Sequence, residues 1–295
     1  MNDRTRAWIL AARPKTLTAA AAPVAVGVGV AALHDVVSPV PALGALVGAL
    51  LIQIATNLAN DYYDFVRGGD THERVGPVRV TQAGLLTPED VYRGMIRVMA
   101  AALLVGVYMV WAGGWPMLVL GLASLACAVL YTGGPWPLAY HGLGELFVFL
   151  FFGLVAVGGT VWVQGRVWPQ DALLAGVAMG ALTTAILVVN NLRDIPTDAK
   201  AGKRTLAVRL GVVGTRLEYA LLLAAALAVP IVGLTWLAWP RTCLAALLVA
   251  PLCLSPLRRV LTFQDPRELF PALGETSRVV ALYGVLLALG LALGG

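Results

Sequence analysis

The sequence predicts an all-α polytopic membrane protein, in which nine transmembrane helices form a bundle around a central cavity. Two observations on its composition carry this prediction. Of its 295 residues, 59% are hydrophobic and only 13% are charged. A soluble globular protein has roughly 45–50% apolar and about 25% charged residues. A mean hydropathy of +0.81 points the same way. We expect one transmembrane domain over residues 1–295.

Nine apolar segments follow one another along the chain, separated by turn-forming stretches such as AGGWP and TGGPWP. Several are shorter than the ~20 residues of a typical spanning helix, but flanking polar side chains and local thinning of the bilayer can compensate. The eighth is the weakest because Pro251 and Pro256 interrupt it. The nine segments are 16–33, 40–56, 98–112, 115–131, 146–163, 172–189, 219–237, 243–257 and 279–293.

The distribution of basic residues tests this count. If the N-terminus is cytoplasmic and nine helices alternate, 19 of the 21 Lys and Arg fall on the inside, and only Arg166 and Arg241 fall outside. The same split disfavours a cleavable signal peptide over residues 4–33. We therefore expect a multi-pass protein of a prokaryotic inner membrane, with the C-terminus outside. The net charge of +5 then records topology, not binding of nucleic acid.

Two long polar loops are expected on the inside, and both begin with the same pattern of Asn and Asp. The helices before them are the second and the sixth, which run in the same direction, so both acidic clusters should reach one membrane face. On a helix, the residues of the first cluster lie at i, i+4 and i+7, on one side. The first cluster is Asn57, Asp61 and Asp64, and the second is Asn190, Asp194 and Asp198.

These clusters favour a divalent metal and a phosphorylated ligand. Carboxylate and amide oxygens suit Mg²⁺, which usually keeps some waters and bridges to substrate phosphates. Basic residues follow each cluster, namely Arg67, Arg74, Arg79, Lys203 and Arg204. Taken singly, an Asp pair at a helix end is more often a solvated cap, and a basic residue beside a membrane is more often a topology signal. Two matching clusters on one face reverse that judgement.

The same reasoning applies to other polar and aromatic residues. Glu145 begins the fifth segment with no Lys or Arg beside it, and an ionisable group there is a functional candidate. Trp136, Tyr140, Trp162 and Trp168 are interpreted mainly as an interfacial aromatic belt. The three cysteines are scattered through apolar segments and predict neither a disulfide framework nor a zinc site.

Several stretches of the chain resemble motifs of a known family. The stretches NDYYD and NLRDIPTDAKAGKRTLAVRLG are similar to the two aspartate-rich motifs of the UbiA superfamily of intramembrane aromatic prenyltransferases, whose members have nine transmembrane helices. RPKTL, RVGPVRVTQAG and GLGELFVFLFFG resemble the menaquinone-pathway branch in particular. The superfamily pattern usually has a third Asp where this chain has Gly68, and Asp70 is expected to take its place.

The resemblance implies a mechanism. Two Mg²⁺ ions would bind an isoprenyl diphosphate, and an apolar groove open to lipid would hold its tail. The electron-rich ring of 1,4-dihydroxy-2-naphthoate, the aromatic acceptor, would attack the allylic carbocation and lose CO₂. Glu145 or a motif aspartate would deprotonate the ring hydroxyl. Because Pro196 lies between Asp194 and Asp198, the second motif is expected on a bent or unwound helix end.

The implied roles divide into two groups. The metal ligands would be Asp61, Asp64, Asp70, Asp194 and Asp198. The residues binding the substrates would be Asn57, Asn60, Asn190, Asn191, Lys15, Arg67, Arg79, Lys203 and Arg204.

Two alternatives remain open from the sequence. Another acceptor, such as 4-hydroxybenzoate, homogentisate or a chlorophyllide, would use the same diphosphate machinery. A secondary transporter would also carry paired carboxylates, although these are expected near the bilayer midplane and not at helix ends. Prenyl chain length and oligomeric state are not encoded in any pattern that we recognise.

Overall fold

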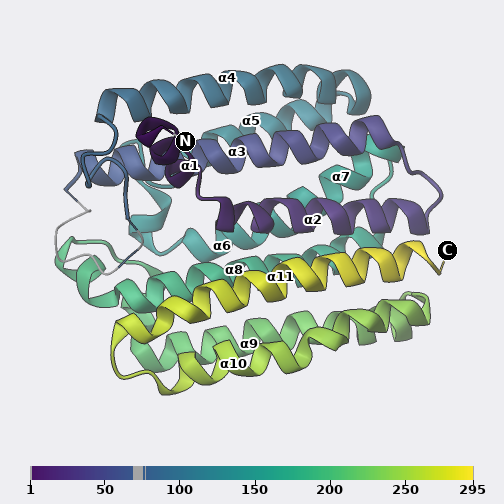
Figure 1. Cartoon of the computed structure of the whole chain (residues 1–295). Helices are drawn as coiled ribbons and strands as arrows, with labels where there is room; N and C mark the ends of the chain where they lie inside the picture. The colour runs from purple at the N-terminus through teal and green to yellow at the C-terminus, as the bar shows by residue number, and fades with distance from the viewer. Residues whose placement is uncertain (1, 69–75, 77, 295) are drawn as a thin grey trace.

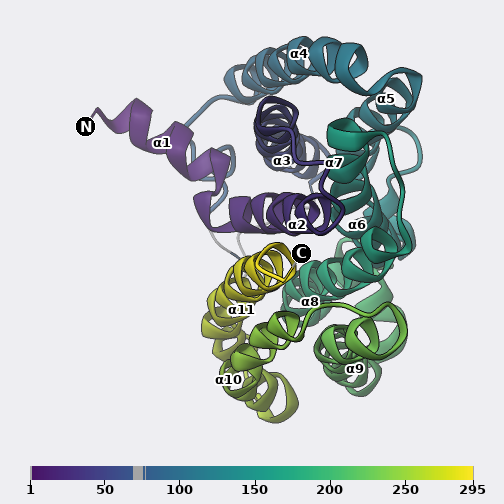
Figure 2. The same ribbon diagram turned by 90° about the vertical axis from the view of Figure 1, so that its right-hand side faces the viewer.

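The computed structural model describes residues 2–68, 76 and 78–294. Every regular element among these residues is a helix (Figures 1 and 2). The helices are α1 Asp3–Ala12, α2 Pro14–Leu33, α3 Pro39–Val66, α4 Pro88–Gly113, α5 Trp115–Leu130, η1 Leu138–His141, α6 Gly144–Val148, η2 Phe149–Val155, α7 Ala156–Gly165, α8 Gln170–Lys200, α9 Leu206–Trp236, η3 Arg241–Val249, α10 Ala250–Thr262, η4 Pro266–Glu268 and α11 Leu269–Ala292.

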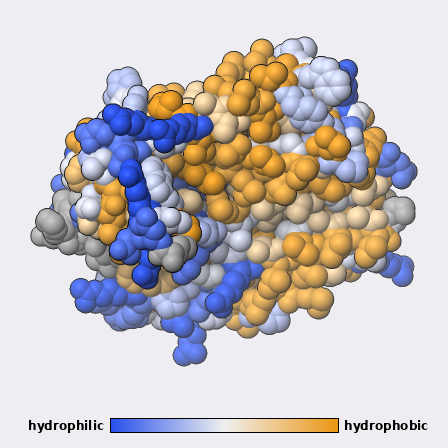
Figure 3. All heavy atoms as spheres, turned by 45° about the horizontal axis from the view of Figure 1, so that its top comes forward, coloured by the Kyte–Doolittle hydropathy of each residue, from blue (hydrophilic) through white to orange (hydrophobic). Residues whose placement is uncertain are grey.

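Each predicted apolar segment lies in this helical array. In the described part of the chain, eight helical stretches are long and apolar enough to cross a membrane, and α5, with 16 residues, is a shorter apolar helix. Side chains such as Leu104, Val107 and Trp236 are exposed, as expected for a surface that faces lipid. Figure 3 shows hydrophobic side chains over the middle of one face and hydrophilic ones gathered at the end where α3 ends. The all-α, polytopic fold is confirmed.

The two helices that carry the acidic motifs are longer than a bilayer requires. α3 has 28 residues and α8 has 31. At 1.5 Å per residue each exceeds the ~30 Å hydrocarbon core by about 12 Å or more. The motifs occupy the last turns of both helices, and Figure 1 shows these two ends on the same side of the bundle. Pro196 does not unwind α8, which stays helical to Lys200, so the unwound form of the predicted bent or unwound end is wrong. A proline removes one backbone hydrogen bond, and here the helix continues for about one more turn beyond it.

The fifth crossing contains a widened turn that the sequence did not indicate. Residues Phe149–Val155 form a π-helix between α6 and α7. There Gly153 packs directly on α8, because a Cβ at this position would lie 2.5 Å from the carbonyl oxygen of Gly176. π-Helical turns are rare and frequently occur at functional sites. This one brings aromatic side chains to the wall of the central cavity, to which Phe151 and Phe152 contribute.

At the end of the bundle away from the motifs, side chains fasten the loops to one another. The indole Nε1 of Trp239 donates to Asp171 Oδ1 at 2.6 Å, and His34 Nε2 lies 2.8 Å from Asp171 Oδ2. The guanidinium of Arg166 donates to the carbonyl oxygen of Ala112 at 2.9 Å. Inter-helix connections are therefore held together by polar contacts at this end.

Candidate active site

The two acidic motifs meet in space, as the sequence predicted. Lys203 follows α8, and its Nζ lies 2.9 Å from Oδ1 of Asp64 in the last turn of α3. These residues are 139 positions apart in the chain. Gly202, with φ of +73°, allows the chain to turn back here, and the Lys203 amide donates to the carbonyl oxygen of Asp198 at 2.9 Å. One ion pair thus joins the regions after the second and sixth crossings.

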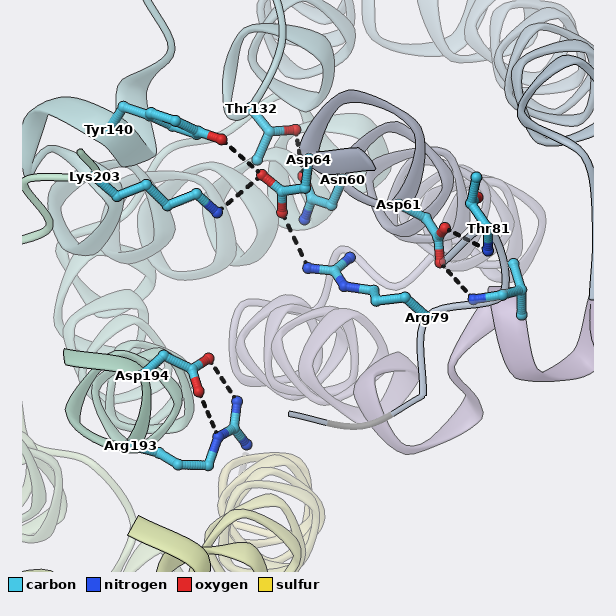
Figure 4. A network of polar contacts seen from close by, with 11 residues as sticks. Asn60, Asp61, Asp64, Arg79, Thr81, Thr132, Tyr140, Arg193, Asp194 and Lys203 are labelled. Carbon is cyan, nitrogen blue, oxygen red and sulfur yellow. Dashed lines mark hydrogen bonds and ion pairs between the residues drawn. The ribbon is translucent and has the colours of Figure 1, made fainter. Parts of the chain in front are cut away.

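Asp64 is the centre of the polar network in Figure 4. It is only 2% exposed, and its carboxylate accepts hydrogen bonds from three side chains. Besides Lys203, the Tyr140 hydroxyl donates to Oδ1 at 3.2 Å and Arg79 Nη2 donates to Oδ2 at 3.1 Å. A buried carboxylate needs such partners, because leaving water without them is very costly.

Tyr140 takes part in this polar network, a role beyond the interfacial aromatic belt predicted for it. It lies in η1, and its ring packs beneath two cations while its hydroxyl bonds Asp64. The Lys203 Nζ is 4.8 Å from the ring centroid and the Arg67 guanidinium carbon is 5.6 Å from it. The sequence did not indicate this role because a lone Tyr in a Gly- and Pro-rich turn carries no signal of its distant partners.

Asp61 points away from Asp64, toward the segment that precedes α4 (Figure 4). Its Oδ2 accepts from the Val80 amide and its Oδ1 from the Thr81 amide, both at 3.1 Å. Asp61 is 1% exposed. The two aspartates of the first motif therefore have separate sets of donors, which removes the mutual repulsion expected of a bare pair.

The second motif carries its own cation. Arg193 donates from Nε and Nη2 to the two carboxylate oxygens of Asp194, both at 2.7 Å. The Arg193 side chain is 1% exposed and its guanidinium lies over the ring of Phe270. From the sequence, Arg193 was counted only as a topology charge. The adjacent Arg-Asp pair was the signal that could have identified it. Asp198 lies one turn later and is partly buried.

The amides of the first motif serve two different purposes. Asn57 Nδ2 donates to the carbonyl oxygen of Ala12 at 2.9 Å and to Thr16 Oγ1 at 3.0 Å, so it holds the α1–α2 junction against α3. Asn60 lies closer to the acidic end, where its Oδ1 accepts from Thr132 Oγ1 at 2.9 Å. The amide nitrogen of Asn57 is thus engaged by protein groups, away from Asp64.

Glu145 lies at the start of α6 and is 5% exposed. Its Oε1 accepts from Asn191 Nδ2 at 2.7 Å, and among the described residues its Oε2 has no hydrogen-bond partner. Tyr131, which sequence reasoning did not single out, lies beside it. The Tyr131 hydroxyl is 2.9 Å from the place where a Cβ on Gly144 would be, so only glycine permits this approach.

The remaining basic candidates lie at the edge of the site. The Lys15 and Arg204 side chains are exposed. The Arg204 amide donates to the Tyr140 carbonyl oxygen at 3.0 Å, so here the backbone contributes to the site. Arg67 is also exposed, and its Nη2 donates to the carbonyl oxygen of Gly134. Asp70 lies outside the described residues.

An apolar cavity of about 550 Å³ leads from the motif end into the bundle. Helices α2 to α5, η2, α7 and α8 supply its walls, which confirms the expected central cavity. Most of its lining is apolar. Its polar residues include Arg13, Asn57, Asn60, Tyr131 and Asn190, so Asn190 faces the cavity.

The donor set fits Mg²⁺ held together with a phosphorylated ligand. Within the described residues no three acidic, His or Cys side chains gather closely enough to hold an ion by themselves. The carboxylates of Asp64 and Asp194 instead belong to separate helix ends, each beside cations (Figure 4). Mg²⁺ typically takes one or two carboxylates and completes its shell with water and phosphate oxygens.

Comparisons with known proteins agree with this geometry. A model of the UbiA prenyltransferase family matches residues 20–278. The chain is 42% identical over 287 residues, 97% of each chain, to 1,4-dihydroxy-2-naphthoate octaprenyltransferase of Mycobacterium tuberculosis. The structure of a UbiA homolog from Aeropyrum pernix K1 superposes with a TM-score of 0.69 at 16% identity, covering 91% of this chain and 96% of that one. A UbiA homolog from Archaeoglobus fulgidus bound to GPP and Mg²⁺ gives 0.64 at 17% identity, covering 95% and 99%.

Proposed function

This chain belongs to the UbiA prenyltransferase family, and on that premise we propose that it transfers a polyprenyl group to 1,4-dihydroxy-2-naphthoate. The donor is an isoprenyl diphosphate, and the product after decarboxylation is demethylmenaquinol. The protein is thus an enzyme that transfers an alkyl group other than methyl, within the pathway to menaquinone. The observation that carries the proposal is the ion pair of Lys203 and Asp64, which unites both acidic motifs at one end of an apolar cavity.

The acidic motifs hold the metal in this proposal. Asp64, Asn60, Asp194 and Asp198 are the residues that would bind two Mg²⁺ ions, and the sequence motif suggests Asp70 as a further ligand. The ions would neutralise the diphosphate and so make it a better leaving group. The Archaeoglobus fulgidus homolog binds GPP and Mg²⁺, and this likeness supports the assignment.

Two of the cations that pair with these aspartates, Arg79 and Lys203, would bind the leaving group, since both contact Asp64. With a metal and a diphosphate bound, Asp64 would help to hold the ion, and Arg79 and Lys203 would contact phosphate oxygens. Buried Arg193 would keep Asp194 oriented. Charges already in position stabilise the negative charge that develops as the carbon–oxygen bond breaks.

The aromatic acceptor binds at the polar end of the cavity, close to Tyr131 and Glu145. Glu145 takes the proton of a ring hydroxyl, which enriches the ring in electrons. The ring carbon that bears the carboxylate then bonds to C1 of the prenyl group, while the diphosphate leaves with the electrons of the C1–O bond. The carboxylate departs as CO₂, its electron pair restores the aromatic ring, and the proton returns to the ring oxygen.

The prenyl tail lies along the apolar part of the cavity. Leu103, Val107, Leu118 and Leu122 line it, and all four side chains are exposed. In this proposal the wall formed by α4 and α5 opens to the lipid. Such a wall lets the tail of a long substrate extend into the bilayer, which accounts for an enzyme built within a membrane.

The proposed orientation places the site at the cytoplasmic face of a prokaryotic inner membrane. The motif end of the bundle also receives most of the basic residues, and a cytoplasmic N-terminus puts 19 of 21 Lys and Arg inside. The C-terminus then lies outside.

An extraction assay tests the function. Purified protein in lipid receives 1,4-dihydroxy-2-naphthoate, a series of isoprenyl diphosphates and Mg²⁺, and the products are identified by mass. We expect prenylated, decarboxylated product that requires Mg²⁺ and forms much more slowly in Asp64→Asn. Faster turnover of 4-hydroxybenzoate or homogentisate would reassign the acceptor, and product formation in the presence of EDTA would contradict the metal requirement. Ion or solute flux in proteoliposomes without a diphosphate would instead support a transporter.

A further inference from the structure

The first aspartate of the first motif contacts backbone, and this contact suggests a role that the motif does not predict. We propose that Asp61 is a positioning residue that anchors residues 79–86 and thereby sets Arg79 on Asp64, and that it is not a ligand of Mg²⁺. The inference rests on the proposed function for the meaning of Arg79, but the anchor itself needs no substrate.

The anchored segment is a compact turn. The Ala83 amide donates to the carbonyl oxygen of Arg79 at 2.9 Å, and the Leu85 amide donates to that of Val80 at 2.9 Å. The amides of Val80 and Thr81, at the start of this turn, both donate to Asp61. This is the arrangement of a helix N-cap, except that the capping carboxylate comes from α3, 19 and 20 residues earlier.

Burial makes the two contacts obligatory. Asp61, Val80 and Thr81 are 1%, 0% and 4% exposed. A carboxylate that left these amides to bind a metal would strand two buried N–H groups without partners. Each of its oxygens already accepts one hydrogen bond, and an exposure of 1% leaves little room for an ion at the remaining lone pairs. The contacts of Asp64 described above come instead from side chains, and these can turn toward a phosphate group.

The anchor also fixes Arg79. Arg79 comes immediately before the two amides, and its guanidinium donates to Asp64 at 3.1 Å. The same short segment is therefore attached to α3 twice, through the backbone at Asp61 and through a side chain one turn later at Asp64. Consecutive residues are about 3.8 Å apart, so a slip of one residue at Asp61 carries the guanidinium out of hydrogen-bond range of Asp64.

The chemistry of the anchor requires a carboxylate of this length. An Asn side chain offers one acceptor oxygen and sets an NH₂ group against the second amide. Asp61→Asn therefore removes one contact and creates a clash of donors while it leaves the size of the side chain unchanged. Asp64→Asn is the matched control, because it makes the same chemical change one turn away.

Two measurements separate an anchor from a metal ligand. In the empty protein, hydrogen exchange of a peptide covering residues 78–86 is expected to speed up about 10-fold or more in Asp61→Asn. It is expected to change by less than about 3-fold in Asp64→Asn, which weakens the Arg79 contact but keeps both backbone contacts. In turnover, Asp64→Asn is expected to raise the Mg²⁺ concentration for half-maximal rate by about 10-fold or more. Asp61→Asn is expected to raise KM for the isoprenyl diphosphate while it shifts the Mg²⁺ requirement by less than about 2-fold.

Thr81→Pro is a second test of whether Asp61 is a backbone anchor or a metal ligand. It deletes the amide hydrogen that binds Asp61 Oδ1 and leaves the carboxylate intact. An anchor predicts a rise in KM for the diphosphate like that of Asp61→Asn, and a metal ligand predicts none. The proposal is overturned if Asp61→Asn and Asp64→Asn shift the Mg²⁺ requirement equally while exchange of residues 78–86 is unchanged. The hydrogen-exchange measurement needs no substrate, so it tests whether Asp61 anchors residues 78–86 even if the natural protein prenylates no naphthoate.

Discussion

Arg193 and Asp194 are neighbours in the chain, and their side chains form a bidentate ion pair with both N–O distances at 2.7 Å. Neighbouring residues on a helix point about 100° apart, so this pair forms only because both side chains turn toward each other. The guanidinium is buried against Phe270, and the carboxylate remains partly open toward the site. Asp194 is thus held in one orientation before any substrate arrives.

Loss of Arg193 should destabilise the protein strongly. Arg193→Met leaves a mostly buried carboxylate unpaired, and the expected loss is about 3–5 kcal/mol in the free energy of unfolding. Thermal unfolding in detergent measures it. Adding Asp194→Asn should restore a large part of the loss. Arg259→Met is the control, because its pair with Glu275 is 43% exposed on the arginine side and such surface pairs contribute about 0–1 kcal/mol. Equal losses in the two variants would contradict the buried role of Arg193.

Lys203 and Arg204 were both predicted to bind the substrates, and their side chains lie in different surroundings: Lys203 contacts Asp64, whereas Arg204 is exposed. Lys203→Met should raise KM for the isoprenyl diphosphate by about 10-fold or more, since a charge-assisted contact at this site contributes about 1.5–3 kcal/mol. Lys203→Arg should recover part of the effect. Arg204→Met should change KM by less than about 2-fold, because its side chain is exposed. Steady-state kinetics at saturating acceptor decide between them, and an Arg204 effect as large as that of Lys203 would argue against this geometry.

The contributions of the Tyr140 hydroxyl and of the Tyr140 ring can be tested separately. Tyr140→Phe removes the hydrogen bond to Asp64 and keeps the ring beneath Lys203 and Arg67. We expect kcat/KM for the diphosphate to fall about 3–10-fold, the usual worth of one hydrogen bond. Tyr140→Leu removes the ring as well and should cost more. If both variants turned over like the natural protein, Tyr140 would have no part in the site.

Glycines on the cavity wall offer a test of the tail path. Gly121 lines the cavity, and a Cβ at this position would meet nothing within 4 Å. Gly121→Leu should therefore fill cavity space without displacing protein atoms. Competition between long and short isoprenyl diphosphates should shift toward the short ones. Gly274→Leu adds the same bulk at another unobstructed glycine, outside the cavity wall, and should leave the preference unchanged.

Much of the fold followed from one-dimensional patterns. Nine apolar segments and the asymmetry of Lys and Arg predicted the helices and the common face of both motifs, because hydrophobic length and charge placement act on each segment separately. The residues that were missed, Tyr140, Arg193 and Tyr131, act through partners that are distant in the chain or through local geometry. The position of a side chain relative to such partners depends on tertiary packing, which the spacing of residues along the sequence does not reveal.

Asp61 is a second case in which the sequence pattern does not reveal the role of a residue. Its motif spacing is that of a metal ligand, and its actual donors are two amides in a connecting segment. Asn57 likewise shares the helix with Asp64 and yet fastens a different junction. A motif therefore identifies which side chains gather at a helix end. Which of them anchors backbone and which faces the site depends on the loops that cover that end.

The contacts of Asp171 with Trp239 and His34 have a mechanical consequence. They tie down the connections at the far end, whereas the motif end is joined largely by ion pairs that a charged substrate can replace. Under the proposed function, a diphosphate headgroup would enter at the motif end by replacing these ion pairs, while the contacts of Asp171 would keep the helix connections together at the other end.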